Sequence, residues 1–287
     1  NHDIFQNRIM FPLMNLENKI VAFSGRVYDT NSKDSKYINT KETNIFKKGE
    51  ILYNYYSSKE EVRVKKYLIL VEGFMDVIRL STIGIKNVVA TMGTSITANQ
   101  MKLLKRLSNN IYLCFDGDDP GKLANINNGE ELIKHDINIK VISLDNDEDP
   151  DSYVLKNGKE KFENLIENAK SYQEYYMEYQ KDTISSSDIK EVTGYINKVL
   201  EKLQYNNNEI EKELVLKKLA KDFDISYNTL ENRLKDYSLK RNTNLEKKEP
   251  KKEESKIVNK YYIASRDLII GMLYDNKVID IYKNYNI

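Results

Sequence analysis

A regular alternation of short apolar runs and amphipathic segments between residues 67 and 145 is the feature that most constrains the fold. We expect strands at 67–73, 87–91, 110–117 and 138–145, with helices at 75–84, 98–107 and 121–135 between them. Strands that are apolar at nearly every position are typical of a parallel sheet covered by helices on both faces. The segment therefore predicts a small α/β domain.

The flanking segments have different patterns. Before the α/β segment we expect a strand at 18–28, followed by a polar, loop-like stretch at 31–43. After it, apolar residues at three- and four-residue spacing predict about four helices over 158–237. Residues 238–256 are charged and almost free of apolar residues, which predicts a linker. A last amphipathic segment, 257–287, predicts the start of a further helical unit.

Acidic residues follow the predicted strands. Glu72 follows the first strand, Asp116 and Asp118 follow the third, and Asp149 and Asp151 follow the fourth. The carboxyl ends of parallel strands meet at one edge of a sheet, so we expect these side chains to lie close together. Crowded carboxylates need counterions, and Mg²⁺ or Mn²⁺ suits oxygen ligands. Glycines beside the acids, at 73, 117 and 121, predict close backbone approach there.

The formal net charge of +1 conceals an uneven distribution. Residues 1–66 contain 12 Lys and Arg against 8 Asp and Glu, whereas residues 116–151 contain 11 Asp and Glu against 3 Lys and Arg. A basic region followed by an acidic one suggests a bound polyanion on one side and bound cations on the other, although both are also compatible with solvated surfaces.

Composition and spacing argue against several classes of protein. A single cysteine, Cys114, excludes a disulfide framework and a cysteine-rich zinc site, and it is expected to be a small core residue. Two histidines, His2 and His135, argue against a histidine metal site or a Ser-His-Asp triad. The spacings of an EF-hand and of a P-loop are absent. No apolar stretch is long enough for a membrane span.

A glutamate after the first strand and a DxD motif after a later strand resemble the Toprim domain, which primases, type IA and II topoisomerases and some nucleases contain. The segments "RIMFPL", "FSGRV", "KYINTKET", "FKKGEILY", "VEGFMDVI", "ATMGTSIT", "CFDGDDPG" and "EDPD" occur in the order and spacing of bacterial DnaG-type primases. One departure is the acidic residue and proline that follow the DxD motif, Asp119 and Pro120. They leave the motif itself intact.

The resemblance implies a domain organisation. Residues 1–64 would be the C-terminal part of a mixed α+β basic subdomain, 65–157 the Toprim catalytic domain, and 158–237 a helical subdomain. The charged linker, 238–256, would lead to the start of a helicase-binding domain at 257–287. The family's zinc-binding domain would lie upstream, so zinc is expected only there, and we expect weak activity from a chain without it.

The resemblance also implies roles for individual residues. Glu72, Asp116 and Asp118 match the family's catalytic metal ligands, and Asp76, Asp149 and Asp151 match the remaining acids of its site. The basic ridge that binds template and nucleotide phosphates is matched by Arg26, Lys36, Asn39 and Lys48. Glu72 and Asp116 would hold the ion at the attacking oxygen, and Asp116 and Asp118 the ion at the triphosphate. A role for Glu72 as a general base stays open.

The function implied by the resemblance is a cytoplasmic DNA-dependent RNA polymerase that synthesises short primers on single-stranded DNA from ribonucleoside triphosphates. Its C-terminal domain would bind the replicative helicase, with no role for a membrane. One alternative is a Toprim nuclease or topoisomerase subunit. Another is a non-enzymatic DNA-binding protein that uses a helix-turn-helix-like segment at 219–234, where Ala220, Ile225 and Leu230 have core spacing. Its acidic residues, with only Arg233 and Lys235 basic on its second helix, argue against phosphate contact.

Overall fold

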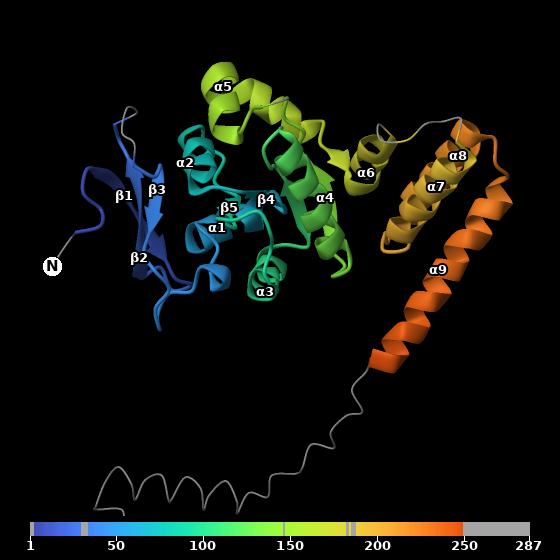
Figure 1. Cartoon of the computed structure of the whole chain (residues 1–287), viewed down its shortest axis with the longest axis horizontal. Coiled ribbons are helices and arrows are strands. Elements are labelled where there is room, and N and C mark those ends of the chain that lie inside the picture. Colours follow the sequence, from blue (N-terminus) through green and yellow to red (C-terminus); the bar gives the residue numbers. More distant parts are fainter. Residues whose placement is uncertain (1–2, 30–33, 146, 182–183, 185–187, 249–287) are drawn as a thin grey trace, which may run out of the picture. The chain divides into compact units, whose positions relative to one another are not determined.

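The computed structural model describes residues 3–29, 34–145, 147–181, 184 and 188–248 (Figure 1). A three-stranded antiparallel sheet is formed by β1 (Arg8–Met14), β2 (Ile20–Val27) and β3 (Tyr37–Asn39), in that order. β2 confirms the strand expected at 18–28. The segment predicted to be a loop contains β3 instead, because pairing with β2 supplies backbone hydrogen bonds that a polar composition does not reveal.

A short connection joins this sheet to the α/β segment. It contains the single-turn helix η1 (Lys48–Glu50) and α1 (Tyr55–Lys65), neither of which the sequence pattern predicted. The connection is held against the next sheet by an isolated bridge between Tyr53 and Ala90, in which each backbone N–H donates to the other residue's carbonyl. The basic segment is thereby tied to the edge strand of the larger sheet.

The larger sheet has five strands in the order β5-β4-β6-β7-β8. Its four parallel strands, β4 (Leu68–Val71), β5 (Val88–Ala90), β6 (Asn110–Leu113) and β7 (Asn138–Val141), confirm the predicted ones. Every residue of the central strand β4 is buried, as expected for a parallel sheet covered on both faces, and so is every residue of the edge strand β5, whose outer side is bridged by Tyr53. The fifth strand, β8 (Lys170–Ser171), pairs antiparallel with β7 and lies in a segment that we predicted to be helical throughout.

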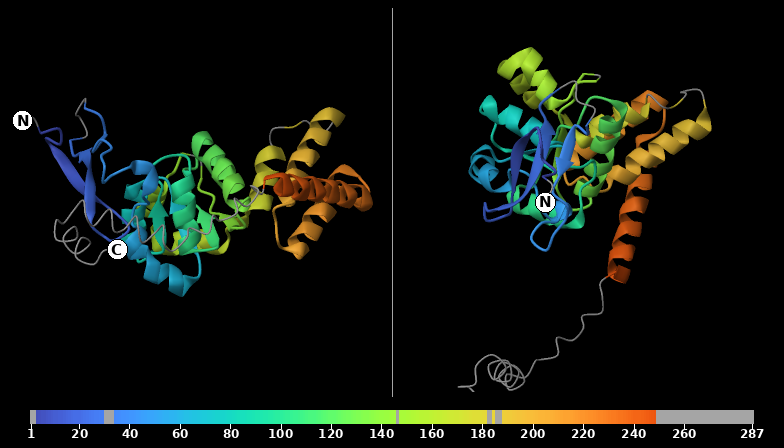
Figure 2. Two further views of the ribbon diagram at one scale, coloured as in Figure 1. Left: turned by 90° about the horizontal axis from the view of Figure 1, so that it is seen from below. Right: turned by 60° about the vertical axis from the view of Figure 1, so that its left-hand side comes forward.

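Helices cover both faces of this sheet (Figures 1 and 2). The chain moves one way along the sheet from β4 to β5, and the other way from β5 to β6 and from β6 to β7. Right-handed crossovers therefore place α2 (Phe74–Thr82) on one face and α3 (Ala98–Leu107) and α4 (Asp119–Ile133) on the other. On the α2 face, α5 (Pro150–Glu167) packs over the sheet through Tyr153, Val154 and Phe162.

The rest of the described chain is largely helical. It comprises the second part of α5, which follows a non-helical Gly158, and then α6 (Tyr172–Lys181), α7 (Ile189–Leu203), α8 (Glu209–Phe223) and α9 (Tyr227–Lys248). α9 corrects the predicted linker, because residues 238–248 are helical; Lys, Arg and Glu favour helix even where no apolar face is present. The remainder of that linker and the segment 257–287 lie outside the described residues. The described chain divides into two compact units, with the boundary between Lys235 and Asp236.

Two contacts join the helical region to the sheet's helices. The ring of Tyr172 lies directly over Gly129 of α4, and its hydroxyl donates to the Ile126 carbonyl at 3.0 Å. Lys202 of α7 is only 8% exposed and lies 2.7 Å from the Glu130 carboxylate of α4. A buried lysine needs such a partner, so this ion pair specifies how α7 sits against α4.

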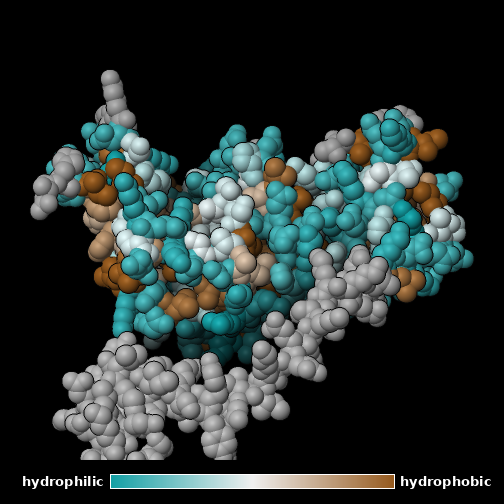
Figure 3. Space-filling model, turned by 60° about the horizontal axis from the view of Figure 1, so that its bottom comes forward, coloured by the Kyte–Doolittle hydropathy of each residue, from teal (hydrophilic) through white to brown (hydrophobic). Residues whose placement is uncertain are grey.

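The surface is mostly hydrophilic on the face shown in Figure 3, with hydrophobic areas over the small N-terminal sheet. Ile9 and Ile20, on β1 and β2, are each 53% exposed. Among the described helices, none has the length and the apolar composition that crossing a membrane would require.

Replacing Gly129 by alanine tests the contact with Tyr172. The new methyl group would lie 2.2 Å from Cε2 of the Tyr172 ring. We expect the free energy of unfolding, measured by urea denaturation, to fall by about 1–3 kcal/mol because the ring cannot move without losing its hydrogen bond. Gly194→Ala on α7 meets open space and should instead raise stability by about 0.5–1 kcal/mol. Equal shifts in both variants would contradict this packing.

Candidate active site

The acidic edge of the sheet is built by backbone contacts between neighbouring loops. Glu72 follows β4 directly, and its carbonyl accepts a hydrogen bond from the Met92 N–H at 2.9 Å. Met92 has a left-handed backbone (φ 58°), which is strained for a residue with a side chain. The backbone at Glu72 is therefore held by the loop that follows β5.

The loop that contains Asp116 is packed equally tightly. A Cβ at Gly117 would lie 2.0 Å from the Asp145 carbonyl oxygen, and the Gly117 N–H donates to the Glu148 carbonyl at 2.8 Å. A Cβ at Gly121 would lie 2.1 Å from the Asp116 carbonyl oxygen. The close approach predicted for these two glycines is confirmed, and it brings the loops after β6 and β7 into contact.

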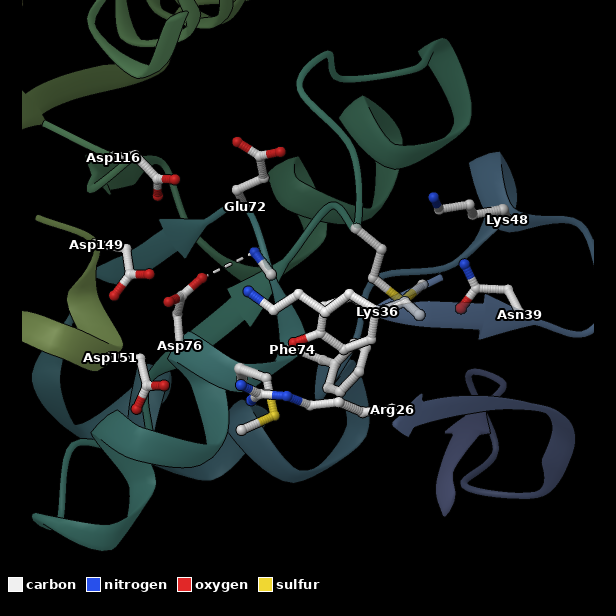
Figure 4. A pocket seen from close by; sticks show the side chains of 14 residues that line it. Arg26, Lys36, Asn39, Lys48, Glu72, Phe74, Asp76, Asp116, Asp149 and Asp151 are labelled. Carbon is white, nitrogen blue, oxygen red and sulfur yellow. Dashed lines mark hydrogen bonds between the residues drawn. The ribbon is translucent and has the colours of Figure 1, made fainter. Parts of the chain in front are cut away.

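One cavity of about 360 Å³ lies at this edge, and both sheets contribute to it. Its acidic residues are Glu72, Asp76, Asp116, Asp149 and Asp151, and its other predicted site residues are Arg26, Lys36, Asn39 and Lys48. Figure 4 shows the carboxylates on one side and the basic side chains on the other. Of the predicted residues, only Asp118 does not line the cavity.

Asp76 is the most deeply buried of these acids, at 7% exposure. Burial raises the pKa of its carboxyl group to about 7, and the charges of Asp149 and Asp116 act in the same direction. Hydrogen bonds from the backbone of Gly73 and Asp151 lower this pKa, and the first of them measures 3.0 Å. The Asp76 side chain thus links the start of α2 to the start of α5.

The pKa values of Glu72 and Asp116 are raised mainly by burial, and also by neighbouring negative charges. Burial, followed by the charges of Glu72, Asp149 and Asp118, raises the pKa of Asp116 to about 6. Burial and the charge of Asp118 also raise the pKa of Glu72, while Lys48 lowers it. Asp118 therefore acts electrostatically on both carboxylates although it lies outside the cavity lining.

The carboxylates differ in the hydrogen bonds that they already accept from the protein. Asp118 caps α4 by accepting the Gly121 N–H at 2.8 Å, and Asp149 caps α5 by accepting the Ser152 N–H at 2.6 Å. Within the described part of the chain, the carboxylates of Glu72 and Asp116 have no hydrogen bond or ion pair. These two carboxylates are the ones most in need of an external counterion.

The opposite wall combines cations with aromatic rings. The Arg26 guanidinium and the Lys36 ammonium lie 5.6 and 5.8 Å from the centre of the Tyr37 ring. Tyr37 in turn contacts Phe74 edge-on at 5.5 Å, and Phe74 also packs on Phe11 at 4.8 Å. Because Phe74 begins α2 and the other rings belong to the small sheet, this contact sets the cations opposite the acids.

The donor set suits a hard divalent cation. Unpaired carboxylates with raised pKa values, gathered round one cavity, are the environment that Mg²⁺ or Mn²⁺ would stabilise. In the described ranges, however, no three carboxylate, imidazole or thiol groups converge closely enough to form a ready-made metal site. The carboxylates therefore line an open cavity and do not form a preorganised metal-binding site.

Both segments of the chain that contribute to this cavity match families of known proteins. Residues 1–59 match the family model described as "DNA primase catalytic core, N-terminal domain", and residues 69–154 match the Toprim-like model. The DNA primase of Staphylococcus aureus (strain COL) is 37% identical over 234 residues, which are 81% of this chain and 39% of the relative. The Escherichia coli primase catalytic core is 30% identical with a TM-score of 0.66, covering 78% of this chain and 72% of that one.

The chain belongs to the DnaG-type primase family. A further solved member, a DnaG primase catalytic domain bound to single-stranded DNA, is 30% identical with a TM-score of 0.68 and matches 79% of this chain and 72% of that one. The chain spans about two fifths of the length of the curated DNA primases it matches.

Membership of the DnaG family does not favour the alternatives. The match over residues 1–59 is to a primase core, which a nuclease or topoisomerase subunit would not explain. In the helix-turn-helix-like region, the two basic residues that were noted on the second helix both have partners within the protein. Arg233 donates to the Asn197 side chain at 3.1 Å, and Lys235 pairs with Glu231 at 3.0 Å.

Three contributors to this DnaG-type site were missed by sequence reasoning. They are the aromatic contact at Phe74, the strained Met92 and the arginine at 79, which pairs with Asp151 at 2.6 Å. Only the arginine could have been noticed in the sequence. It follows Asp76 by three residues, so it lies on the same side of the predicted helix as that acid.

Replacing Gly117 by alanine should separate the loops after β6 and β7. The obstacle is backbone, which cannot rotate away, so we expect a loss of about 1–3 kcal/mol in the free energy of unfolding. Gly93→Ala, after β5 at the same edge, meets nothing within 4 Å and should change stability little. Urea denaturation of both variants measures the difference, and unaltered stability of Gly117→Ala would refute the close contact.

Proposed function

We propose that this chain catalyses template-directed synthesis of RNA primers on single-stranded DNA, using ribonucleoside triphosphates. The observation that carries the proposal is the single cavity with carboxylates from three strand ends on one side and phosphate-binding side chains on the other. Metal-dependent nucleotidyl transfer needs both, because cations and a polyanionic substrate must meet at one point. The 3′ oxygen of one nucleotide would attack the α-phosphate of the next, with pyrophosphate leaving.

The residues proposed to hold the divalent ions are Glu72, Asp116 and Asp118. Bound there, such ions would neutralise phosphate charge and favour the ionised attacking oxygen. The carboxylates of Glu72 and Asp116 have no partner to displace among the residues that the structure describes, and the second carboxylate oxygen of Asp118 is not used by its helix cap. Asp76 and Asp149 would add negative charge to the same wall.

Arg26, Lys36, Asn39 and Lys48 are proposed to bind template and nucleotide phosphates. Arg26 and Lys36 share the Tyr37 ring, which limits the conformations of two otherwise flexible side chains. Lys48 is close enough to Glu72 to affect its pKa, so a phosphate bound by Lys48 would lie near the carboxylates. These contacts grip the nucleic-acid backbone and do not read its bases.

The relatives' names and titles support the DNA template, since one solved DnaG domain is described as bound to single-stranded DNA. A function in replication would place the protein in the cytoplasm. Contact with the replicative helicase would fall to residues 257–287, which are outside the described part of the chain.

Asp116→Asn tests the catalytic assignment. The change keeps the size of the side chain and removes its charge, so we expect primer synthesis on single-stranded DNA with Mg²⁺ or Mn²⁺ to fall by roughly 100-fold or more. Asp119→Asn is the matched control, because this carboxylate is fully exposed, stands beside the DxD motif and does not line the cavity. Equal ribonucleotide incorporation by Asp116→Asn and the unmodified chain would refute the assignment.

Lys36→Ala tests the basic wall. Loss of one phosphate contact should weaken single-stranded DNA binding similarly for all sequences and reduce the slope of log K against log salt by about 0.7. Lys102→Ala on α3, also exposed but away from the cavity, controls for the lost charge. Fluorescence anisotropy at several salt concentrations measures both. An unchanged salt slope in Lys36→Ala would remove this residue from the template site.

A further inference from the structure

Asp151 differs from the other acids of the cavity in the partner that it has. The Arg79 Nε donates to its Oδ1 at 2.6 Å, and the two side chains are only 32% and 25% exposed. A charge-assisted hydrogen bond of this length between partly buried groups is among the stronger contacts available to a carboxylate. Among the cavity acids, within the described chain, Asp151 alone forms an ion pair with a positively charged side chain.

The position of the arginine is determined by packing behind the cavity. Arg79 lies in the last turn of α2, and Asp151 lies in the first turn of α5. The two helices are in contact, and Val77, Leu80 and Tyr153 belong to the same buried core cluster. Asp151 lines the cavity whereas Arg79 does not, so the guanidinium reaches the carboxylate from outside the substrate space.

The other acids are bound in a way that leaves them available to a cation. Asp76, Asp118 and Asp149 accept backbone N–H groups, which carry only partial charge. The carboxylates of Glu72 and Asp116 have no hydrogen bond or ion pair in the ranges that the structure describes. The acidic side of the cavity therefore has two parts. The charge of Asp151 is neutralised by Arg79, whereas the charges of Glu72 and Asp116 are not neutralised by a bound side chain in the described chain.

We propose that Arg79 is a built-in counterion that withholds Asp151 from divalent-cation binding and confines the metal site to the Glu72–Asp116 part of the wall. This inference rests on the proposed function, because it concerns the same metal site. A guanidinium bound to the carboxylate repels a divalent ion and occupies one of its two oxygens. Asp151 serves instead to hold α5 against α2.

Counting bound Mn²⁺ tests the proposal without relying on activity. The electron paramagnetic resonance signal of free Mn²⁺, titrated into the full chain, gives the number and affinity of bound ions. Arg79→Gln removes the charge and frees Asp151 to act with Asp149 and Asp76, so we expect the weakest ion to bind about tenfold more tightly, or one more ion to bind. Arg79→Lys keeps the charge and should bind Mn²⁺ like the unmodified chain.

Arg63→Gln is the matched control for lost charge. Arg63 also pairs with a carboxylate at 2.6 Å, that of Glu60, but the pair is exposed on α1 and the change should leave Mn²⁺ binding unaltered. The increase in Mn²⁺ binding expected for Arg79→Gln must disappear in the double variant that also carries Asp151→Asn, because the carboxylate freed by the first change is then absent. A gain that persists there, or no gain in Arg79→Gln, would overturn the proposal.

Two more variants keep the result interpretable. Asp151→Asn alone is expected to change Mn²⁺ binding less than twofold, since its carboxylate is already occupied; loss of an ion in this variant would overturn the proposal even if Arg79→Gln did not fold. Asp116→Asn should abolish the tightest site. If it does not, the proposed metal assignment fails, and that failure is distinct from any result at Arg79.

Discussion

Mutual repulsion between carboxylates at one edge of a parallel sheet is the constraint on which the rest of this site depends. Burial and neighbouring negative charge raise the pKa values of Asp76 to about 7 and of Asp116 to about 6. Such a cluster is stable only if backbone N–H groups, a basic side chain or bound cations offset it. The helix caps at Asp118 and Asp149 and the pair between Arg79 and Asp151 are the protein's own contributions.

The two sheets that line the cavity are joined by aromatic packing, in addition to the backbone bridge between Tyr53 and Ala90. Phe74 begins α2 and packs against the rings of Phe11, Tyr37 and Tyr53. Tyr37 also lies beneath the two cations of the basic wall. The ring contacts of Phe74 therefore link the strand that carries Lys36 and Tyr37 to the helix that begins at the acidic edge.

Much of the fold could be predicted because its signals are local. The four parallel strands and the three helices between them follow from short apolar runs and from periodicity, as in "LILV" and its successors. β3, α1 and β8 could not be predicted in this way. β3 and β8 are defined by pairing with strands elsewhere in the chain, and residues 238–248 are helical although their composition resembles a linker.

The sequence by itself determined which acids stand at strand ends, since alternation of strand and helix places Glu72, Asp116 and Asp149 at one sheet edge wherever the helices pack. Only the tertiary structure decided what each acid does there. Whether a carboxylate caps a helix, pairs with Arg79 or is left without a partner depends on distances of a few ångströms between loops far apart in the chain. Those distances come from the packing of Gly117, Gly121 and Phe74. The two glycines predicted a close approach, but only the structure shows which backbone atoms they approach, and nothing in the sequence indicated the contact at Phe74.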